Sequence, residues 1–507
     1  HKLAGSAYSL EEIIAAGIAN CKRACAPYGA LAALDVGPLG ELLEPNGTLA
    51  FEDAVEEYAR IVRAGAAAGA DLIFFETFTD LYELKAALLA ARENSSLPIL
   101  ASMSFEAGGR TFTGCTVESF GVTARGLGAS AVGINCSLGP KEIFPMAKRL
   151  TEAVPGNFPV FVKPNAGLPR ADGSGYDITP QLFALEMKPY RELNLFAAGG
   201  CCGTTPEFIK LLNSVFAGCV PGRPAHEMPS VLCTPVDFVN VDGITVVGER
   251  INPTGKKRFQ QALREEDMNY VLEQAVSQVE AGAQVLDVNV GAPMVDEALL
   301  LPELVQRLTG KYAEPLSLDS SHAEAIAAAL PFCPGSPLVN SISGEADRME
   351  HLGPLCRQWG APFILLPIQG RKLPVKAADR IAIIENMLDK AAMLGIPRRL
   401  VLVDVLALAV ASKAEAAREG LETIRWCAAH GLATTIGLSN ISFGLPAREL
   451  VNTTFLSMAM GAGLSSCIAN PSSGRLREAK AAGDVLMGHD RDAAAFVNGY
   501  AMWTPGN

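Results

Sequence analysis

Short apolar runs alternate with longer helix-like stretches along the whole chain. The short runs are continuously apolar, as in Ala131–Cys136 and Leu316–Asp319, which is typical of strands buried on both faces. The longer stretches, such as Glu52–Ala68 and Leu81–Arg92, are rich in Ala, Glu and Leu. This alternation predicts βαβα units and therefore an α/β protein whose parallel sheets are covered by helices.

The first half of the chain contains six predicted strands. They are Leu31–Val36, Leu72–Glu76, Ile99–Phe105, Ala131–Cys136, Pro159–Lys163 and Leu195–Ala198. Six strands cannot close a (β/α)8 barrel, and the helix-like opening, Leu10–Arg23, leads directly into a strand. We therefore expect a TIM-type barrel that lacks its first two βα units, with a different fold as the alternative.

The second half contains eight predicted strands. They are Thr245–Glu249, Val285–Asn289, Leu316–Asp319, Leu338–Ser341, Phe363–Pro367, Leu400–Asp404, Thr434–Leu438 and Ser465–Ala469. Eight βα units predict a complete (β/α)8 TIM barrel. A doubly wound sheet is the alternative, but it would need a glycine-rich loop after its first strand, and the sequence has none there.

We therefore predict two TIM-type barrels in tandem. The first spans residues 1–216 and the second residues 236–507, and the proline-rich stretch 217–235 between them is the predicted linker.

Composition narrows the classes of function. About half of the residues are apolar and 19% are charged, which supports large cores, and the formal net charge of −12 without a Lys/Arg cluster argues against nucleic-acid binding. No apolar run reaches membrane-spanning length, and the start of the sequence shows no signal-peptide pattern. We therefore expect no membrane partner. The 12 cysteines are scattered along the chain, which is not the pattern of a disulfide scaffold, so we expect reduced thiols and a cytoplasmic protein.

Three cysteines follow predicted strands of the first half. Cys136 ends one strand, and Cys201 and Cys202 follow the last strand in a glycine-rich turn, Gly199–Gly203. In a parallel barrel these strand ends share one face, so three thiols can converge there and form a zinc site with one open position for an incoming thiol. Buried structural cysteines are the alternative.

Two further polar residues lie at strand ends of the same half. Glu76 is a candidate for binding the amino group of a substrate, with a helix-capping or core role as the alternative. Asn165, in Pro-Asn-Ala-Gly, is either a site residue or a turn residue.

Nearly every predicted strand of the second half ends in a carboxylate or an amide. These residues are Glu249, Asn252, Asp287, Asn289, Asp319, Asn340, Asp404, Asn440 and Asn470. Such a ring at a barrel mouth suits a planar heterocycle with both donors and acceptors, such as a pterin. Helix and turn caps, or a divalent cation such as Mg²⁺, are the alternatives.

Several motifs at these positions carry a resemblance to a known family. They are Gly-Ile-Asn-Cys-Ser-Leu-Gly-Pro (133–140), Pro-Asn-Ala-Gly (164–167), Gly-Gly-Cys-Cys-Gly-Thr-Thr-Pro (199–206), Gly-Glu-Arg-Ile-Asn-Pro-Thr-Gly (248–255), Leu-Asp-Val-Asn (286–289) and Gly-Leu-Ser-Asn-Ile-Ser-Phe-Gly-Leu-Pro (437–446). On the basis of these motifs, the chain resembles the homocysteine and folate modules of cobalamin-dependent methionine synthases along essentially its whole length. The pterin motif is shared with other corrinoid methyltransferases and, more loosely, with dihydropteroate synthases.

The resemblance implies specific roles for these residues. Zinc ligands would be Cys136, Cys201 and Cys202, and Glu76 and Asn165 would bind homocysteine. The residues implied to bind 5-methyltetrahydrofolate are Glu249, Asn252, Asp287, Asp319, Asn340, Asp404, Asn440 and Arg448. Catalytic roles are implied for Asp319 and for Asn440, which would lie near N5 of the pterin. The implied reaction moves the methyl group of the folate through cobalamin to the zinc-activated thiol of homocysteine, giving methionine and tetrahydrofolate.

The sequence departs from the family pattern in two ways. The Asp-Gly-rich turn that ends the family's first strand has no counterpart here, and no Asp-x-His-x-x-Gly cobalamin motif is present, so we expect the corrinoid on another domain or protein. Two alternative functions stay open: a corrinoid-independent homocysteine S-methyltransferase fused to a folate enzyme, and a non-catalytic folate-binding remnant.

Overall fold

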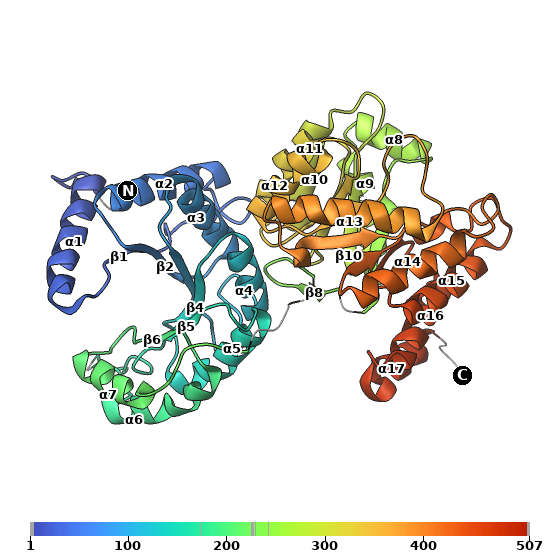
Figure 1. Cartoon of the computed structure of the whole chain (residues 1–507). Coiled ribbons are helices and arrows are strands. Elements are labelled where there is room, and N and C mark those ends of the chain that lie inside the picture. Colours follow the sequence, from blue (N-terminus) through green and yellow to red (C-terminus); the bar gives the residue numbers. More distant parts are fainter. Residues whose placement is uncertain (1–4, 174, 225–227, 229, 242, 504–507) are drawn as a thin grey trace. The chain divides into compact units, whose positions relative to one another are not determined.

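The computed structural model divides the chain into two compact units, residues 1–228 and residues 229–507, called here the first and the second unit (Figure 1). It describes residues 5–173, 175–224, 228, 230–241 and 243–503. Both units are α/β structures built on parallel strands, as the alternating pattern predicts.

The first unit contains a sheet of six parallel strands in sequential order, β1 to β6. The strands are β1 (Ala33–Val36), β2 (Leu72–Phe78), β3 (Ile99–Met103), β4 (Ala131–Asn135), β5 (Val160–Lys163) and β6 (Ala197–Ala198). The helices are α1 (Leu10–Cys25), α2 (Phe51–Ala67), α3 (Leu81–Asn94), α4 (Val117–Gly126), α5 (Pro140–Ala153), α6 (Pro180–Glu186) and α7 (Pro206–Phe216). Each of the six predicted strands is present, and every residue of β4 is buried, as its apolar run requires.

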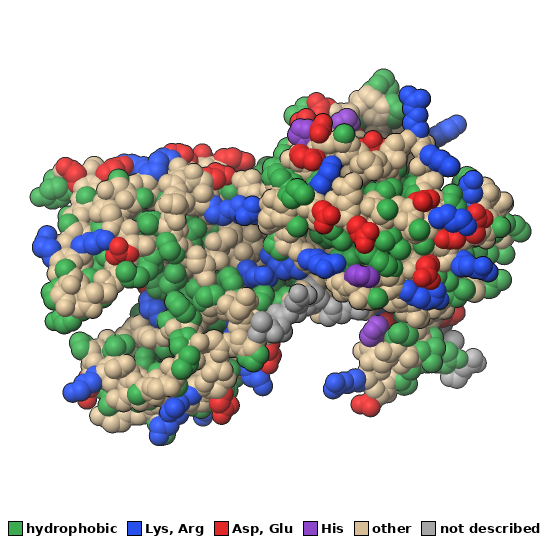
Figure 2. Space-filling view, in the orientation of Figure 1, with side chains coloured by type: hydrophobic (Ala, Val, Ile, Leu, Met, Phe, Trp, Pro, Cys, Tyr) green, Lys and Arg blue, Asp and Glu red, His purple; other side chains and the backbone are tan. Residues whose placement is uncertain are grey.

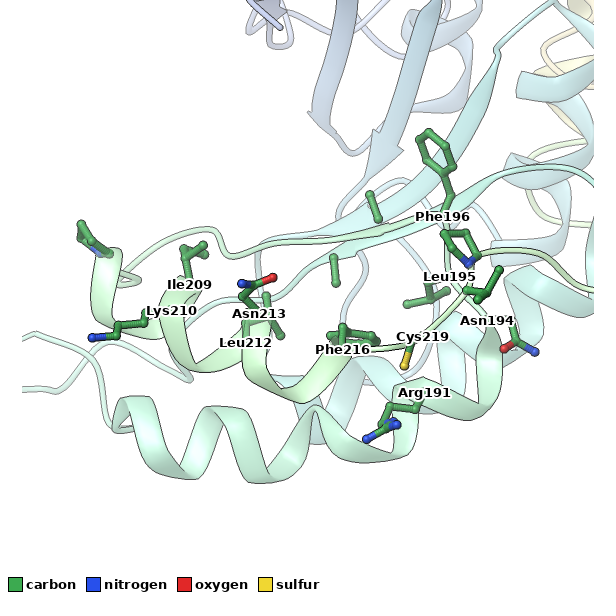
Figure 3. A pocket seen from close by; sticks show the side chains of 15 residues that line it. Arg191, Asn194, Leu195, Phe196, Ile209, Lys210, Leu212, Asn213, Phe216 and Cys219 are labelled. Carbon is green, nitrogen blue, oxygen red and sulfur yellow. The ribbon is translucent and has the colours of Figure 1, made fainter. Parts of the chain in front are cut away.

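The sheet of the first unit has two edge strands, β1 and β6. A groove of about 480 Å³ runs along β6 and α7 and is lined in part by Phe196, Ile209, Phe216 and Cys219 (Figure 3). None of the three candidate zinc ligands lines this groove.

The second unit contains eight parallel strands in the order β15-β14-β13-β12-β11-β10-β9-β16. The strands are β9 (Thr245–Ile251), β10 (Val285–Asn289), β11 (Leu316–Asp319), β12 (Leu338–Ser343), β13 (Phe363–Leu366), β14 (Val401–Asp404), β15 (Ala433–Thr435) and β16 (Ser466–Ala469). A parallel bridge between Gly437 and Ile468 joins the two ends of this order and closes the barrel. The eight predicted strands are therefore present as a TIM-type barrel.

Helices cover the outside of the second barrel (Figure 1). They are α8 (Lys257–Arg264), α9 (Met268–Glu280), α10 (Glu297–Thr309), α11 (Ala323–Ala329), α12 (Arg348–Trp359), α13 (Ala377–Met393), α14 (Ala416–Ala429), α15 (Arg448–Ala462), α16 (Gly474–Leu486) and α17 (Ala494–Trp503). No helix within the described ranges combines the length and the apolar character that crossing a bilayer requires. Figure 2 shows acidic and basic side chains side by side on the visible face.

An antiparallel hairpin precedes the second barrel. It pairs β7 (Val231–Cys233) with β8 (Phe238–Asn240), so the stretch 217–235 that we interpreted as a linker contains the strand β7. Leu232 and Val239 of the hairpin pack into one cluster with residues near the amino-terminal ends of the barrel strands, including Val285 and Leu338. The hairpin therefore covers the end of the barrel opposite the strand ends that carry the polar ring.

Candidate functional sites

The three cysteines of the first unit converge at the carboxyl ends of its strands. The sulfur atoms of Cys136, Cys201 and Cys202 all lie within 4.8 Å of one another, and the Sγ atoms of Cys136 and Cys202 are 3.7 Å apart. Three thiolates on one tetrahedral zinc ion, each at about 2.3 Å from it, would have sulfur atoms about 3.8 Å apart. The trio therefore fits a zinc ion, with the fourth position left to another ligand.

Backbone bends bring the cysteines together. Cys136 and Ser137, directly after β4, both adopt left-handed backbone conformations, with φ of 62° and 60°. The Cys136 N–H donates to the Lys163 carbonyl at 3.1 Å, and the Cys201 N–H donates to the Pro164 carbonyl at 2.8 Å. The loop after β5 thus holds the loops after β4 and β6 on either side of it.

Asn165 holds the third cysteine. Its side chain is buried, and its Oδ1 accepts a hydrogen bond from the Cys202 N–H at 3.0 Å. Gly203, which follows, has a φ of 78°, and a Cβ there would lie 2.3 Å from the Tyr176 ring, so this turn requires glycine. In this structure Asn165 therefore positions a candidate zinc ligand, and any contact with homocysteine stays a prediction.

The thiols share their protons unequally. The hydrogen bond with Cys201 lowers the pKa of Cys136 to about 7, and the same interaction raises the pKa of Cys201. One thiolate is therefore available near neutral pH, which is the form that binds a soft metal ion.

Asn135 is a residue of this site that the sequence analysis did not select. It is fully buried, its Nδ2 lies 3.7 Å from the Cys201 sulfur, and it donates to Thr77 Oγ1 at 2.7 Å. Its Oδ1 accepts from the Thr77 N–H and from the Ser102 hydroxyl. An asparagine inside an apolar strand, one residue before a cysteine, is the signal that could have identified it.

Glu76 lies near the carboxyl end of β2 and forms an ion pair with Lys163, which ends β5. Both side chains are largely buried, with exposed fractions of 18% and 25%. No sequence pattern points to Lys163, because an ion pair between strands far apart in the chain leaves none. A paired carboxylate at this face can still meet the amino group of a substrate, since a carboxylate accepts several hydrogen bonds.

Three residues of the predicted ring in the second unit form one cluster, in which Asp287 is buried and Asp319 and Asn340 are half-buried. Asp287 accepts hydrogen bonds from the Ser317 hydroxyl at 2.7 Å and from Asn340 Nδ2 at 3.2 Å. Burial and the charge of Asp319 raise the pKa of Asp287 well above its usual range, and burial also raises the pKa of Asp319. The carboxyl groups of Asp287 and Asp319 form a hydrogen bond with each other. Such a pair shares a proton, so it can both donate and accept hydrogen bonds.

Glu249 lies near the end of β9, the strand beside β10, and contacts the loop after β15. It accepts hydrogen bonds from the Ser439 hydroxyl at 3.0 and 3.2 Å, and burial raises its pKa. Arg448 donates to the Ser439 carbonyl at 2.6 Å, and Asn440 beside it has an exposed side chain. The structure therefore brings Glu249, Asn440 and Arg448 to one side of the mouth.

The other predicted ring residues lie at the ends of their strands or in the turns directly after them. Asp404 accepts from the Leu406 N–H at 2.8 Å, and burial raises the pKa of Asp404 to about 6. Asn252, Asn289 and Asn470 each accept from a backbone N–H two residues further on, which is the turn role that we weighed for them. Among the described residues, the group of three His, Cys, Asp or Glu side chains close enough to share a metal ion is the cysteine trio.

Comparison with known proteins identifies both units. The family model "Homocysteine S-methyltransferase" matches residues 1–216, and the model "Pterin binding enzyme" matches residues 248–470. The chain joins a homocysteine S-methyltransferase domain to a pterin-binding domain. The methyltransferase match contains the three converging cysteines, and the pterin-binding match contains the polar ring from Glu249 to Asn470.

Two curated relatives match most of the chain. The chain is 32% identical to the methionine synthase of Mycobacterium tuberculosis (strain ATCC 25618 / H37Rv) over 429 residues, and 31% identical to that of Mycobacterium leprae (strain TN) over 434 residues. Each match covers 80% of this chain but 36% of the relative, so the chain spans about a third of the length of these proteins. Among solved structures, a dihydropteroate synthase from Xanthomonas albilineans matches 51% of this chain and 98% of its own at 18% identity, with a TM-score of 0.41.

Proposed function

We propose that this chain acts in methionine synthesis as a 5-methyltetrahydrofolate–homocysteine S-methyltransferase. The methyltransferase domain would bind zinc and homocysteine, and the pterin-binding domain would bind 5-methyltetrahydrofolate. The observation that supports this most directly is the convergence of three thiols within 4.8 Å, inside the homocysteine S-methyltransferase domain. Cobalamin, which would carry the methyl group between the two substrates, would be held by another domain or protein.

The residues of the first unit would prepare the thiol of homocysteine. Cys136, Cys201 and Cys202 would hold the zinc ion and leave one position open. Zinc, when bound there, would supply a thiolate nucleophile at neutral pH by lowering the pKa of the incoming thiol. Asn135 and Asn165 keep Cys201 and Cys202 in place, and the Glu76 carboxylate would orient the substrate through its amino group.

The residues of the second unit would bind the pterin by complementary hydrogen bonds. Asp319 and Asp404 would accept from its amino and ring N–H groups, while Asn340 can both donate and accept. Asn440 would lie near N5 and orient it by a hydrogen bond as that atom is protonated, since an amide is a poor acid. Arg448 would contact the folate tail.

Zinc analysis of the variant Cys202→Ala tests the first half of this proposal. The unchanged chain should bind one zinc ion per molecule and transfer the methyl group of added methylcobalamin to homocysteine, and Cys202→Ala should lose both properties. Cys219→Ala is the matched control, because Cys219 lies in the same unit but outside the trio. Stoichiometric zinc in Cys202→Ala would refute the assignment.

Two further measurements, folate binding and methyl transfer from 5-methyltetrahydrofolate without cobalamin, separate the two alternative functions. A folate-binding remnant would bind 5-methyltetrahydrofolate but would not methylate homocysteine from methylcobalamin. A corrinoid-independent enzyme would methylate homocysteine from 5-methyltetrahydrofolate with no cobalamin in the reaction.

A further inference from the structure

Arg380 is the largest fully buried side chain in the described part of the molecule, with an exposed fraction of 0%. It lies in the first turn of α13, on the outside of the second barrel. A buried guanidinium is costly unless its N–H groups find acceptors. Its Nε donates to the Pro374 carbonyl at 3.0 Å and its Nη1 donates to the Val405 carbonyl at 2.7 Å.

These two hydrogen bonds join consecutive loops at the barrel mouth. Pro374 lies in the loop between β13 and α13, and Val405 lies directly after β14, next to Asp404. The Val405 N–H donates to the Thr435 carbonyl of β15 at 3.1 Å. The backbone N–H of Val405 is therefore held by the neighbouring strand, and its backbone carbonyl is held by Arg380. Asp404 in turn accepts from the N–H of Leu406, whose φ of 57° is left-handed.

We propose that Arg380 is a positioning residue of the pterin site, which acts on the Asp404 carboxylate at the barrel mouth both through its bond to the Val405 carbonyl and through its buried positive charge. This inference rests on the proposed function of the second unit. Arg380 is not a catalytic residue, because it acts on the ligand through Asp404.

The charge of Arg380 adds a second effect on the same carboxylate. Burial raises the pKa of Asp404 to about 6, and the positive charge of Arg380 opposes that rise. Burial lowers the pKa of Arg380, while the charges of Glu419 and Asp404 raise it. Arg380 also keeps one nitrogen, Nη2, without a hydrogen-bond partner among the described residues, so no direct ion pair neutralises it there.

The other charged groups near these elements have partners of their own or are exposed. Glu419, in the first turn of α14, accepts from the Ala377 N–H and pairs with Lys376 at 3.2 Å, and Glu415 lies 3.9 Å from the same lysine. Asp379 of α13 and Lys413 before α14 are exposed. Arg380 is therefore the group whose charge favours ionised Asp404, the form that accepts a hydrogen bond from a pterin N–H.

The test is the pH dependence of 5-methyltetrahydrofolate binding by the full chain, measured from pH 5 to 8.5. The three variants are Arg380→Met, Arg380→Gln and Arg380→Lys. Methionine removes the donors and the charge, glutamine keeps a donor without the charge, and lysine keeps the charge with one donor group. Arg357→Met is the matched control, because Arg357 also donates to a backbone carbonyl, that of Leu394, but in the last turn of α12.

Without the charge of Arg380, the pKa of Asp404 rises, so the pH midpoint of binding should move upward in Arg380→Met and Arg380→Gln. A shift of about one unit lowers the affinity on the order of tenfold below the midpoint, and the difference from the unchanged chain narrows toward pH 8.5. Arg380→Lys should keep the original midpoint, and Arg357→Met should match the unchanged chain.

Binding by Arg380→Met and Arg380→Gln with the original midpoint, whether at full affinity or uniformly weakened, would overturn the inference and leave Arg380 a purely structural residue. If circular dichroism shows that Arg380→Met does not fold, the inference is tested by comparing the pH midpoint of folate binding in Arg380→Gln with that in Arg380→Lys. Absence of folate binding in the unchanged chain would instead refute the proposed function, and the inference about Arg380 with it.

Discussion

Buried amides, rather than the thiols themselves, fix the geometry of the candidate zinc site. Asn165 accepts from the backbone of Cys202, and Asn135 links β2 and β3 to the sulfur of Cys201. Both amides are buried, so removing either leaves polar groups without partners in an interior where water cannot replace them. Zinc affinity should therefore depend on residues that do not touch the ion.

Asn165→Ala should keep all three thiols but weaken zinc binding. The Cys202 N–H loses its acceptor, which costs about 1–3 kcal/mol, and outer residues of zinc sites typically change affinity by roughly 10–100-fold. Competition with a chromophoric chelator measures this loss. Asn213→Ala, an exposed asparagine on α7 of the same unit, should leave the affinity unchanged, and a wild-type affinity in Asn165→Ala would contradict the prediction.

The carboxyl pair of the second unit should make its stability pH-dependent. Burial and the charge of Asp319 raise the pKa of Asp287, so the folded chain holds a proton that the unfolded chain releases above a pKa of about 3.9. The free energy of unfolding therefore falls as the pH rises from that value through the raised pKa of the folded pair. Asp287→Asn removes one titrating group and the repulsion, so we expect a smaller slope.

Urea unfolding at several pH values from 4 to 8 measures that slope. The three tryptophans, Trp359, Trp426 and Trp503, all lie in the second unit, so tryptophan fluorescence reports on this unit alone. Glu385→Gln, an exposed substitution on α13, is the control and should keep the original slope. An unchanged slope in Asp287→Asn would show that the pair does not share a proton.

At the scale of elements, the alignment of β4 with β5 decides where the thiol loops meet. Gly133 of β4 faces Phe161 of β5 in register, and a Cβ there would lie 2.4 Å from the Phe161 ring and 2.6 Å from its carbonyl oxygen. A backbone atom cannot rotate away, so a larger residue would force the two strands apart. The shift would reach Cys136 and Lys163, three and two residues further along these strands.

Gly133→Ala should therefore destabilise the first unit and weaken zinc binding together. Overpacking of this kind costs about 1–3 kcal/mol. Gly17→Ala is the matched control, because nothing lies within 4 Å of a Cβ at this exposed helical position, where alanine should stabilise by about 0.5–1 kcal/mol. Thermal unfolding by circular dichroism and zinc content measure both effects, and a fully stable, zinc-replete Gly133→Ala would contradict the prediction.

The strands were predictable because burial on both faces leaves a continuous apolar run, as in β4 and β14. The hairpin β7–β8 was not predictable, because its strands are only three residues long, form no long apolar run and have Pro235 between them. The strand β15 ends at Thr435, earlier than the predicted Leu438, because the chain enters a 3-10 turn at Leu438–Asn440 that exposes Asn440.

At the scale of the whole molecule, strand-end positions predicted where the candidate residues lie but not what they contact. Because parallel strands end on one face, the placement of Cys136 and Asp319 followed from the pattern alone. The ion pair of Glu76 with Lys163 and the bond of Arg380 to Val405 join residues far apart in the sequence, and no local pattern records them. The positioning residues therefore required the structure.

The cysteine trio and the polar ring lie in different units, so the two candidate sites should respond separately to their ligands. Removing zinc with a chelator should abolish methyl transfer from methylcobalamin to homocysteine, because the thiol of homocysteine stays protonated at neutral pH. The dissociation constant for 5-methyltetrahydrofolate should not change, since Asp319, Asn340 and Asp404 lie in the second unit. Adding zinc back should restore the transfer.

Asn340→Ala supplies the reciprocal measurement. It removes a donor to Asp287 and, on the proposed function, one contact with the pterin. Folate affinity should therefore fall by about tenfold or more, while zinc content and methyl transfer to homocysteine should stay as in the unchanged chain. Equilibrium dialysis and metal analysis on the same sample give both values. A change of roughly fivefold or more in folate affinity on zinc removal would reveal energetic coupling between the sites, because a coupling free energy acts equally on both ligands.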